Sequence, residues 1–310
     1  MTIDEGRLDP WVAEWFEANP MMGQPFDDLS PEMLELARGP VGFPVTREIA
    51  HVTDDVADGV PVRVYRGEGA PTGVLAYFHG GGFCIGSIGL MDNVARELSH
   101  CTGAVVVSAE YRLAPEHPYP AGLDDCETVT RWAAASAARF DAPDRIAVGG
   151  ESAGGNLSAA VALRLRDDAD VRLAAQLLMY PVLDTNTADH ASRKEFEGLV
   201  LTQKARDAYW GAYAGGRDLQ HDPFVAPLQA DDLTGLPPAL LVLGGCDLLR
   251  DEGRVYSERL RTAGVDAEDV CYAGQPHGFI NFMFPVAHEA FDRIGAWWRS
   301  LLKTSRAPGA

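Results

Sequence analysis

The feature that most constrains the fold is a five-residue turn at 150–154, in which a serine stands between two glycines. It reads Gly-Glu-Ser-Ala-Gly, follows the apolar run 145–149 and precedes a helical pattern over 156–166. A strand, a sharp turn and a helix in this order hold the central residue, Ser152, in a strained conformation above the end of the strand. The N-terminal N–H groups of the following helix point toward the same place. We therefore interpret Ser152 as a nucleophile, the alternative being a Gly/Ser-rich turn that only allows close packing.

A second glycine motif, His79-Gly80-Gly81-Gly82-Phe83, also follows an apolar run, residues 74–78. Three successive glycines free the backbone to turn its N–H groups into a concave pocket that no side chain blocks. Such donors stabilise the negative charge that develops on a carbonyl oxygen during acyl transfer. A phosphate-binding loop is the alternative, but neither a Gly-Lys-Ser/Thr ending nor the spacing Gly-x-Gly-x-x-Gly is present. We favour an oxyanion hole.

A serine nucleophile needs a base, and the base needs an orienting acid. Four histidines follow the serine in the chain. His288 begins an amphipathic helix, and His190 and His221 fall in an irregular polar region before the next strand. His277 lies in a loop rich in Pro and Gly, directly after the strand-like run 270–272. A side chain in that loop can reach across the strand ends, so His277 is the expected base.

The acid is expected at the end of another strand. The apolar run 239–243 leads through two glycines and a cysteine to Asp247. The carboxyl ends of parallel strands form the edge at which sites in such sheets lie. Asp251 and Glu252 are rivals, but they begin the next helix, where acidic residues commonly interact with the helix dipole. We favour Asp247.

Taken together, these motifs resemble the bacterial hormone-sensitive-lipase family of serine esterases, which has the α/β-hydrolase fold. The resemblance extends over about 200 positions and keeps the family's motif order. Its motifs are His79-Gly80-Gly81-Gly82, Tyr111-Arg112-Leu113-Ala114-Pro115-Glu116, Gly150-Glu151-Ser152-Ala153-Gly154-Gly155, Asp247-x-Leu249-x-Asp251-Glu252 and His277-Gly278-Phe279.

The resemblance implies a catalytic triad, an oxyanion hole made of three backbone N–H groups, and neither a metal nor an organic cofactor. The residues so implied are Ser152, Asp247 and His277 for the triad and Gly81, Gly82 and Ala153 for the oxyanion hole. One position departs from the family's pattern. The family most often has Asp, or Thr in another branch, where this chain has Glu151, which keeps the charge but changes its reach.

Strand-like and helix-like segments alternate along the chain, which predicts a mostly parallel sheet with helices on both faces. Eight strands are expected at 47–53, 60–66, 73–79, 104–110, 145–149, 173–180, 239–244 and 267–272. Helices are expected at 91–100, 121–138, 153–166, 250–263 and 285–302. The fold class is therefore α/β, with an eight-stranded central sheet.

Two segments lie outside this alternation, residues 1–45 and residues 184–227. The first has an aromatic helical face and a second short helix from Ser30, and the second has apolar residues at helical spacing. In the family that the chain resembles, such segments form a helical cap over the acyl pocket, so 46–310 is the expected catalytic domain. The expected lining of the pocket is Phe83, Val200, Leu201, Trp210, Phe279 and Ile280.

Composition restricts the partners and the compartment. The formal net charge of −19 argues against nucleic acid and anionic membranes. The five cysteines are odd in number and show no C-x-x-C spacing, which favours reduced thiols in a cytoplasmic protein. We find no signal peptide and no apolar run long enough to insert into a membrane. Pairs of acidic residues lie scattered in loops, and we assign them no metal.

The expected function is hydrolysis of carboxylic esters through an acyl-enzyme, without a cofactor. Short to medium acyl chains are what the resemblance implies. An amidase, peptidase or carbamate hydrolase with the same triad is the alternative. A small-ligand receptor on the same scaffold is a second one, disfavoured because plant gibberellin receptors lack the histidine that this chain has at His277. Family members also dimerise through the last strand and helix, here 267–272 and 285–302. Trp297 and Trp298 are then either interface residues or packing of their own subunit.

Overall fold

The computed structural model describes the chain except residues 1–5, 40–43, 186–187, 197–198 and 305–310. Its centre is an eight-stranded sheet with the order β1-β2-β4-β3-β5-β6-β7-β8, in which β2 is antiparallel to both of its neighbours, β1 and β4, and every other pair of neighbouring strands is parallel. The strands are β1 His51–Ala57, β2 Val60–Arg66, β3 Val74–Phe78, β4 Val105–Ala109, β5 Ile146–Glu151, β6 Leu173–Met179, β7 Ala239–Cys246 and β8 Ala267–Pro276. The expected mostly parallel sheet is confirmed.

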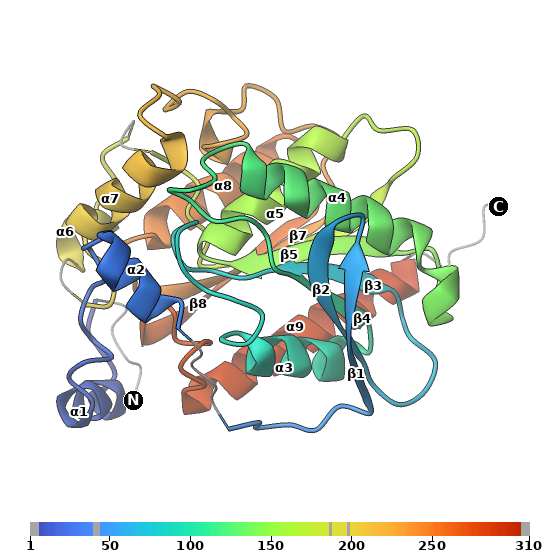
Figure 1. The fold of residues 1–310 in the computed structure, drawn as a ribbon, viewed down its shortest axis with the longest axis horizontal. Helices are drawn as coiled ribbons and strands as arrows, with labels where there is room; N and C mark the ends of the chain where they lie inside the picture. The colour runs from blue at the N-terminus through green and yellow to red at the C-terminus, as the bar shows by residue number, and fades with distance from the viewer. Residues whose placement is uncertain (1–5, 40–43, 186–187, 197–198, 305–310) are drawn as a thin grey trace.

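Both faces of the sheet are buried under helices, as β3 shows. Side chains of a strand alternate between the two faces. Val74 and Ala76 belong to one apolar core, and Leu75 and Tyr77 belong to the other. The first core is covered by α4 (Ala121–Ala135), α5 (Ala153–Leu165) and α8 (Arg250–Thr262), and the second by α3 (Asp92–Thr102) and α9 (Pro285–Thr304) (Figure 1).

The first strand lies later in the chain than expected. We expected it at 47–53, whereas β1 ends at Ala57, which pairs with Val60 across a tight turn. Asp58 and Gly59 make this turn with positive φ values of 47° and 99°, and Asp-Gly is a favoured pair for such hairpins.

The chain before this strand crosses α3 instead of joining the sheet. The Arg47 guanidinium there binds the Glu97 carboxylate, with a closest N···O distance of 2.9 Å. An apolar alternation alone could not reveal this long-range ion pair.

The two segments outside the strand–helix alternation contain short helices that lie together at one side of the molecule (Figure 1). They are α1 Pro10–Ala18 and α2 Pro31–Ala37 from the first segment, and α6 Ser192–Glu195 and α7 Gln203–Ala214 from the second. Leu34 of α2 packs in one apolar cluster with Ala205 and Tyr209 of α7. The segments therefore touch each other although about 170 residues separate them.

The two tryptophans of α9 pack inside their own subunit. Trp297 and Trp298 are 3% and 2% exposed and belong to the core between α9 and the sheet. The indole Nε1 of Trp298 also donates a hydrogen bond to Thr72 Oγ1 at 2.8 Å. Of the two alternatives, packing within the subunit is the one that the structure supports.

Candidate active site

Ser152 stands on the sharp turn between β5 and α5. Its backbone has φ 55° and ψ −116°, a conformation that a non-glycine residue seldom adopts and that marks stored strain. The turn is held because Ser152 N donates to Met179 O of the neighbouring strand at 2.9 Å. Gly154 has to be glycine, since a Cβ there would overlap the Phe78 carbonyl group. The strained turn raises the serine hydroxyl above the carboxyl end of β5.

His277 and Asp247 come from the ends of the two strands that finish the sheet. Asp247 directly follows β7, and His277 directly follows β8. His277 Nε2 lies 2.9 Å from Ser152 Oγ, and His277 Nδ1 lies 2.8 Å from Asp247 Oδ2. A hydrogen-bonded chain of this kind can take the proton from the serine and hold the imidazole in the tautomer that accepts it.

Asp247 is held in place by a second hydrogen bond besides the one to the histidine. The residue is 1% exposed, and its second carboxylate oxygen, Oδ1, accepts a hydrogen bond from Leu249 N at 2.8 Å. The rival Asp251 binds elsewhere: its carboxylate accepts from Ser192 N at 2.9 Å and pairs with Arg250. The structure therefore brings Asp247, and not Asp251, to the histidine ring.

The three other histidines that follow Ser152 in the chain do not line its cavity. His221 and His288 are exposed. His190 is buried, and its Nε2 lies 3.2 Å from Asp184 Oδ2.

The glycine motif before α3 folds beside the serine. Gly81, Gly82 and Phe83 all have positive φ, of 117°, 59° and 64°. A Cβ on Gly82 would overlap the ring of Tyr209, so only glycine lets this backbone come so close to α7. Among the described residues, none accepts a hydrogen bond from the N–H of Gly81 or Gly82. Both N–H groups remain available to a substrate oxygen.

The third expected donor, Ala153 N, belongs to the first residue of α5. The first N–H groups of a helix have no acceptor within the helix. With Gly81 and Gly82, which line the same cavity as Ser152, Ala153 can supply the third N–H of an oxyanion hole.

The serine opens into a mainly apolar cavity of about 240 Å³. Four of the expected pocket residues line it, namely Phe83, Val200, Leu201 and Trp210. Sequence reasoning missed further lining residues on segments distant in the chain, among them Gln24, Phe26, Met91, Arg206, Tyr209, Leu249, Asn281 and Phe282. Of these, only Tyr209 lay on an apolar helical stripe that the sequence made visible. Arg206 is the charged member of the described lining.

The prediction that Phe279 and Ile280 line the pocket was wrong. Both side chains are 0% exposed and lie in the core rather than in the cavity. The backbone turns at Gly278, with φ 75°, and sends Phe279 inward against Tyr180 and Tyr272. The same loop reaches the cavity through Gly278, Asn281 and Phe282 instead.

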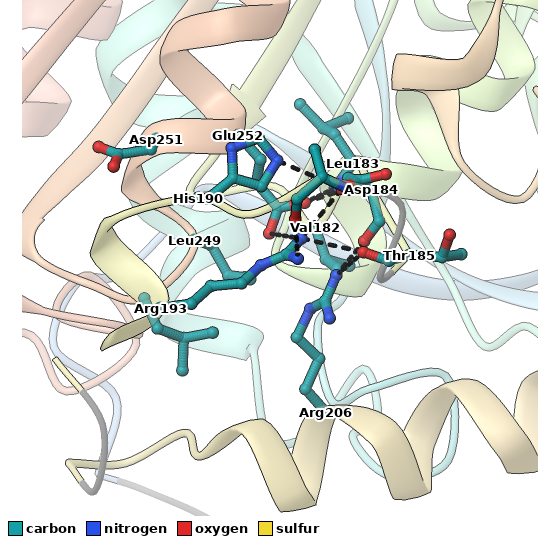
Figure 2. A network of polar contacts seen from close by, with 12 residues as sticks. Val182, Leu183, Asp184, Thr185, His190, Arg193, Arg206, Leu249, Asp251 and Glu252 are labelled. Atoms are coloured by element: carbon teal, nitrogen blue, oxygen red, sulfur yellow. Dashed lines mark hydrogen bonds and ion pairs between the residues drawn. The ribbon is translucent and has the colours of Figure 1, made fainter. Parts of the chain in front are cut away.

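A buried network of charged groups lies behind the cavity and joins α6 and α7 to α8 (Figure 2). Glu252 Oε2 accepts from Leu183 N at 2.9 Å and from Asp184 N at 2.6 Å. The Arg193 guanidinium lies 3.2 Å from Asp184 Oδ2 and 3.8 Å from Glu252 Oε1. Burial raises the pKa of Glu252, and the nearby arginines oppose this change.

The same network fixes residues of the cavity wall. Arg206 donates to the Thr185 carbonyl oxygen at 2.6 Å and to that of Asp184. Arg206, Val182 and Leu249, which are labelled in Figure 2, also line the cavity. The position of α7 over the serine therefore depends on buried charges of α8.

Replacing Glu252 by alanine is expected to destabilise the fold by about 3–5 kcal/mol, because two buried N–H groups lose their acceptor and the arginines lose a counter-charge. Chemical denaturation measures this loss. The matched control is Glu268→Ala, whose carboxylate is half-exposed and pairs with Arg293, and whose loss is expected to cost under about 1 kcal/mol. Equal costs for the two variants would contradict the structural role of the network.

The described residues hold no group of three or more His, Cys, Asp or Glu side chains placed to bind a metal ion. None of their helices has the length and apolar character needed to cross a membrane.

Comparison with known proteins gives consistent matches. Residues 75–281 match the family described as alpha/beta hydrolase fold. The esterase LipI of Mycobacterium tuberculosis is 35% identical over 304 residues, which cover 94% of this chain and 95% of LipI. The carboxylesterase NlhH of the same organism is 40% identical over 247 residues, 76% of each chain. The structure of a hyperthermophilic esterase from Pyrobaculum calidifontis superposes with a TM-score of 0.85 at 32% identity, covering 97% of this chain and 100% of that one.

Proposed function

This chain belongs to the α/β-hydrolase family, in the hormone-sensitive-lipase group of esterases, and we propose that it is a serine carboxylesterase that needs no cofactor. The observation that carries the proposal is the hydrogen-bonded chain Asp247–His277–Ser152, which ends at an apolar cavity beside two free N–H groups. Relatives named as esterases and carboxylesterases support the same reaction class.

In the proposed mechanism, Ser152 Oγ attacks the ester carbonyl while His277 Nε2 takes its proton. Asp247 holds the imidazole and stabilises the imidazolium. The N–H groups of Gly81, Gly82 and Ala153 bind the oxyanion of the tetrahedral intermediate. Its collapse expels the alcohol, which takes the proton from the imidazolium, and leaves an acyl-enzyme. His277 then takes a proton from water while the water oxygen attacks the acyl carbonyl and forms a second tetrahedral oxyanion. Its collapse breaks the bond between Ser152 Oγ and the acyl carbon, Ser152 takes the proton back from the imidazolium, and the carboxylic acid leaves.

We propose that the two segments 1–45 and 184–227 act as a cap over 46–310. They supply Phe26, Val200, Leu201 and Trp210 to the cavity wall. An apolar cap excludes water and strengthens the contacts to the oxyanion. A cavity of this size and polarity suits short to medium acyl chains.

A series of p-nitrophenyl esters from acetate to palmitate tests the proposal, with matched p-nitroanilides beside them. We expect turnover of the esters with an optimum at short to medium acyl chains, and much slower turnover of the anilides. The Ser152→Ala variant is the control for spontaneous and contaminating hydrolysis. Faster cleavage of the anilides than of the esters would favour an amidase, and a folded wild type that turns over neither would contradict the proposal.

Two further expectations stay predictions. The homodimer is supported by β8, which pairs only with β7 in the described sheet and so has an open edge next to α9; light scattering measures it. A cytoplasmic location is supported by the five cysteines, whose odd number and lack of C-x-x-C spacing favour reduced thiols.

A further inference from the structure

One buried carboxyl group next to the nucleophile has no part in the mechanism above. Glu151 is the last residue of β5, directly before Ser152, and its side chain is 0% exposed. Buried carboxyl groups are expensive unless they are paired or hydrogen-bonded. A site that keeps one beside its nucleophile calls for a physical reason.

The carboxyl group of Glu151 joins the strand end to the neighbouring glycine loop. Oε1 accepts a hydrogen bond from Gly80 N, and Oε2 accepts one from the Tyr77 hydroxyl, both at 2.6 Å. Gly80 also packs directly on Glu151, since a Cβ on Gly80 would lie 2.9 Å from the Glu151 carbonyl oxygen. Gly80 begins the oxyanion loop, residues 80–82, so Glu151 holds this loop one residue before its two free N–H groups.

We propose that Glu151 is a positioning residue whose carboxylate fastens the oxyanion loop to the serine turn and so fixes the hole that binds the transition state. The inference rests on the proposed esterase function. Hydrogen bonds to an ionised acceptor are shorter and about twice as strong as those between neutral groups. The ionised form of Glu151 should therefore define the loop better than the neutral acid does.

The ionisation of Glu151 falls in an accessible pH range. Burial raises its pKa from the ordinary 4.5 to about 7, while the hydrogen bonds from Tyr77 and Gly80 oppose the rise. The titratable groups that face it are the phenols Tyr77, Tyr111 and Tyr180, whose own pKa values burial raises, so they stay neutral. Because the folded-state pKa is raised, Glu151 favours folding fully below pH 4.5, and this contribution is lost as the pH rises through 7.

The deciding variant is Glu151→Gln, which keeps the size but removes the charge. At pH 8 we expect kcat per titrated active site to fall about tenfold with KM within about twofold, because the loss concerns the transition state. At the same pH the variant should unfold at a higher temperature than wild type, because it no longer buries a charged group. A slower yet more stable enzyme is the expected combination.

The pH profile separates positioning from mere structural support. In wild type, kcat/KM should fall about tenfold as the pH is lowered through the pKa of Glu151, about 7, because the neutral acid holds the loop less well. In Glu151→Gln this tenfold step should be absent. Tyr77→Phe removes one hydrogen bond that lowers the pKa of Glu151, and should shift that ionisation to higher pH. This variant also tests the inference should Glu151→Gln fail to fold.

A matched control is Glu97→Gln, which replaces another buried glutamate, on α3, where it pairs with Arg47. We expect it to lose stability while kcat and the tenfold step in the pH profile stay unchanged. The inference is overturned if Glu151→Gln behaves like this control. Failure of the proposed function is a separate outcome, in which Ser152→Ala turns over esters as fast as wild type.

Discussion

Replacing Ser152 by alanine is expected to lower kcat for p-nitrophenyl acetate by about 10⁶-fold, to little more than what binding and the oxyanion hole achieve alone. The variant has no oxygen to form the acyl-enzyme, so water has to attack the ester directly. KM should change little, because the serine hydroxyl adds little to ground-state binding. Steady-state kinetics on purified, folded protein measures the loss.

Two further variants, His277→Ala and the double variant Ser152→Ala/His277→Ala, test this prediction more strictly. Ser152 and His277 share one hydrogen bond of 2.9 Å and act in one proton transfer. Either single replacement should therefore cost about as much as the two together, since residues that act as a unit are not additive. Losses that multiply in the double variant would mean that the two side chains act independently and that the triad is wrong.

Replacing Asp247 by asparagine is expected to lower kcat about 10⁴-fold with the fold intact. The asparagine amide can donate to His277 Nδ1, which favours the tautomer with the proton on Nε2. That nitrogen can then no longer accept the serine proton. Asp247 is almost fully buried and has no other charged partner in the contacts described, so the loss should appear in kcat at every pH that leaves the protein folded.

Asp251→Asn is the matched control for this replacement, since Asp251 lies four residues away and also follows β7. Its carboxylate binds Ser192 N and Arg250 rather than the histidine. We expect kcat within about threefold of wild type and a small loss of stability. If Asp251→Asn lost most of its activity while Asp247→Asn kept its activity, Asp251 and not Asp247 would be the acid of the triad.

Sequence motifs were enough to predict the parts of the site that belong to strand ends. Ser152 is marked by its flanking glycines, and Asp247 and His277 each follow an apolar run that became β7 or β8. Because parallel strands place their carboxyl ends at one edge, residues in these positions meet without further information. The strand-like pattern of the sequence also predicted β2, whose bounds at 60–66 agree with the structure.

The pocket wall could not be predicted in the same way. Whether Phe279 points into the cavity or into the core depends on the turn at Gly278, and both directions suit an aromatic residue. Gln24 reaches the cavity only because its segment packs beside α7, a contact between distant parts of the chain. The contacts of Glu252 likewise join separate elements, so its position in a helix start suggested a dipole role instead.

Covalent labelling tests the central claim most directly. A p-nitrophenyl alkylphosphonate should phosphonylate the nucleophile and release one equivalent of p-nitrophenol per chain, and mass spectrometry of the digest identifies the modified residue. The account predicts a single adduct on Ser152, with no adduct in Ser152→Ala and a much slower reaction in His277→Ala. An adduct on another residue, or none on folded wild type, would contradict it.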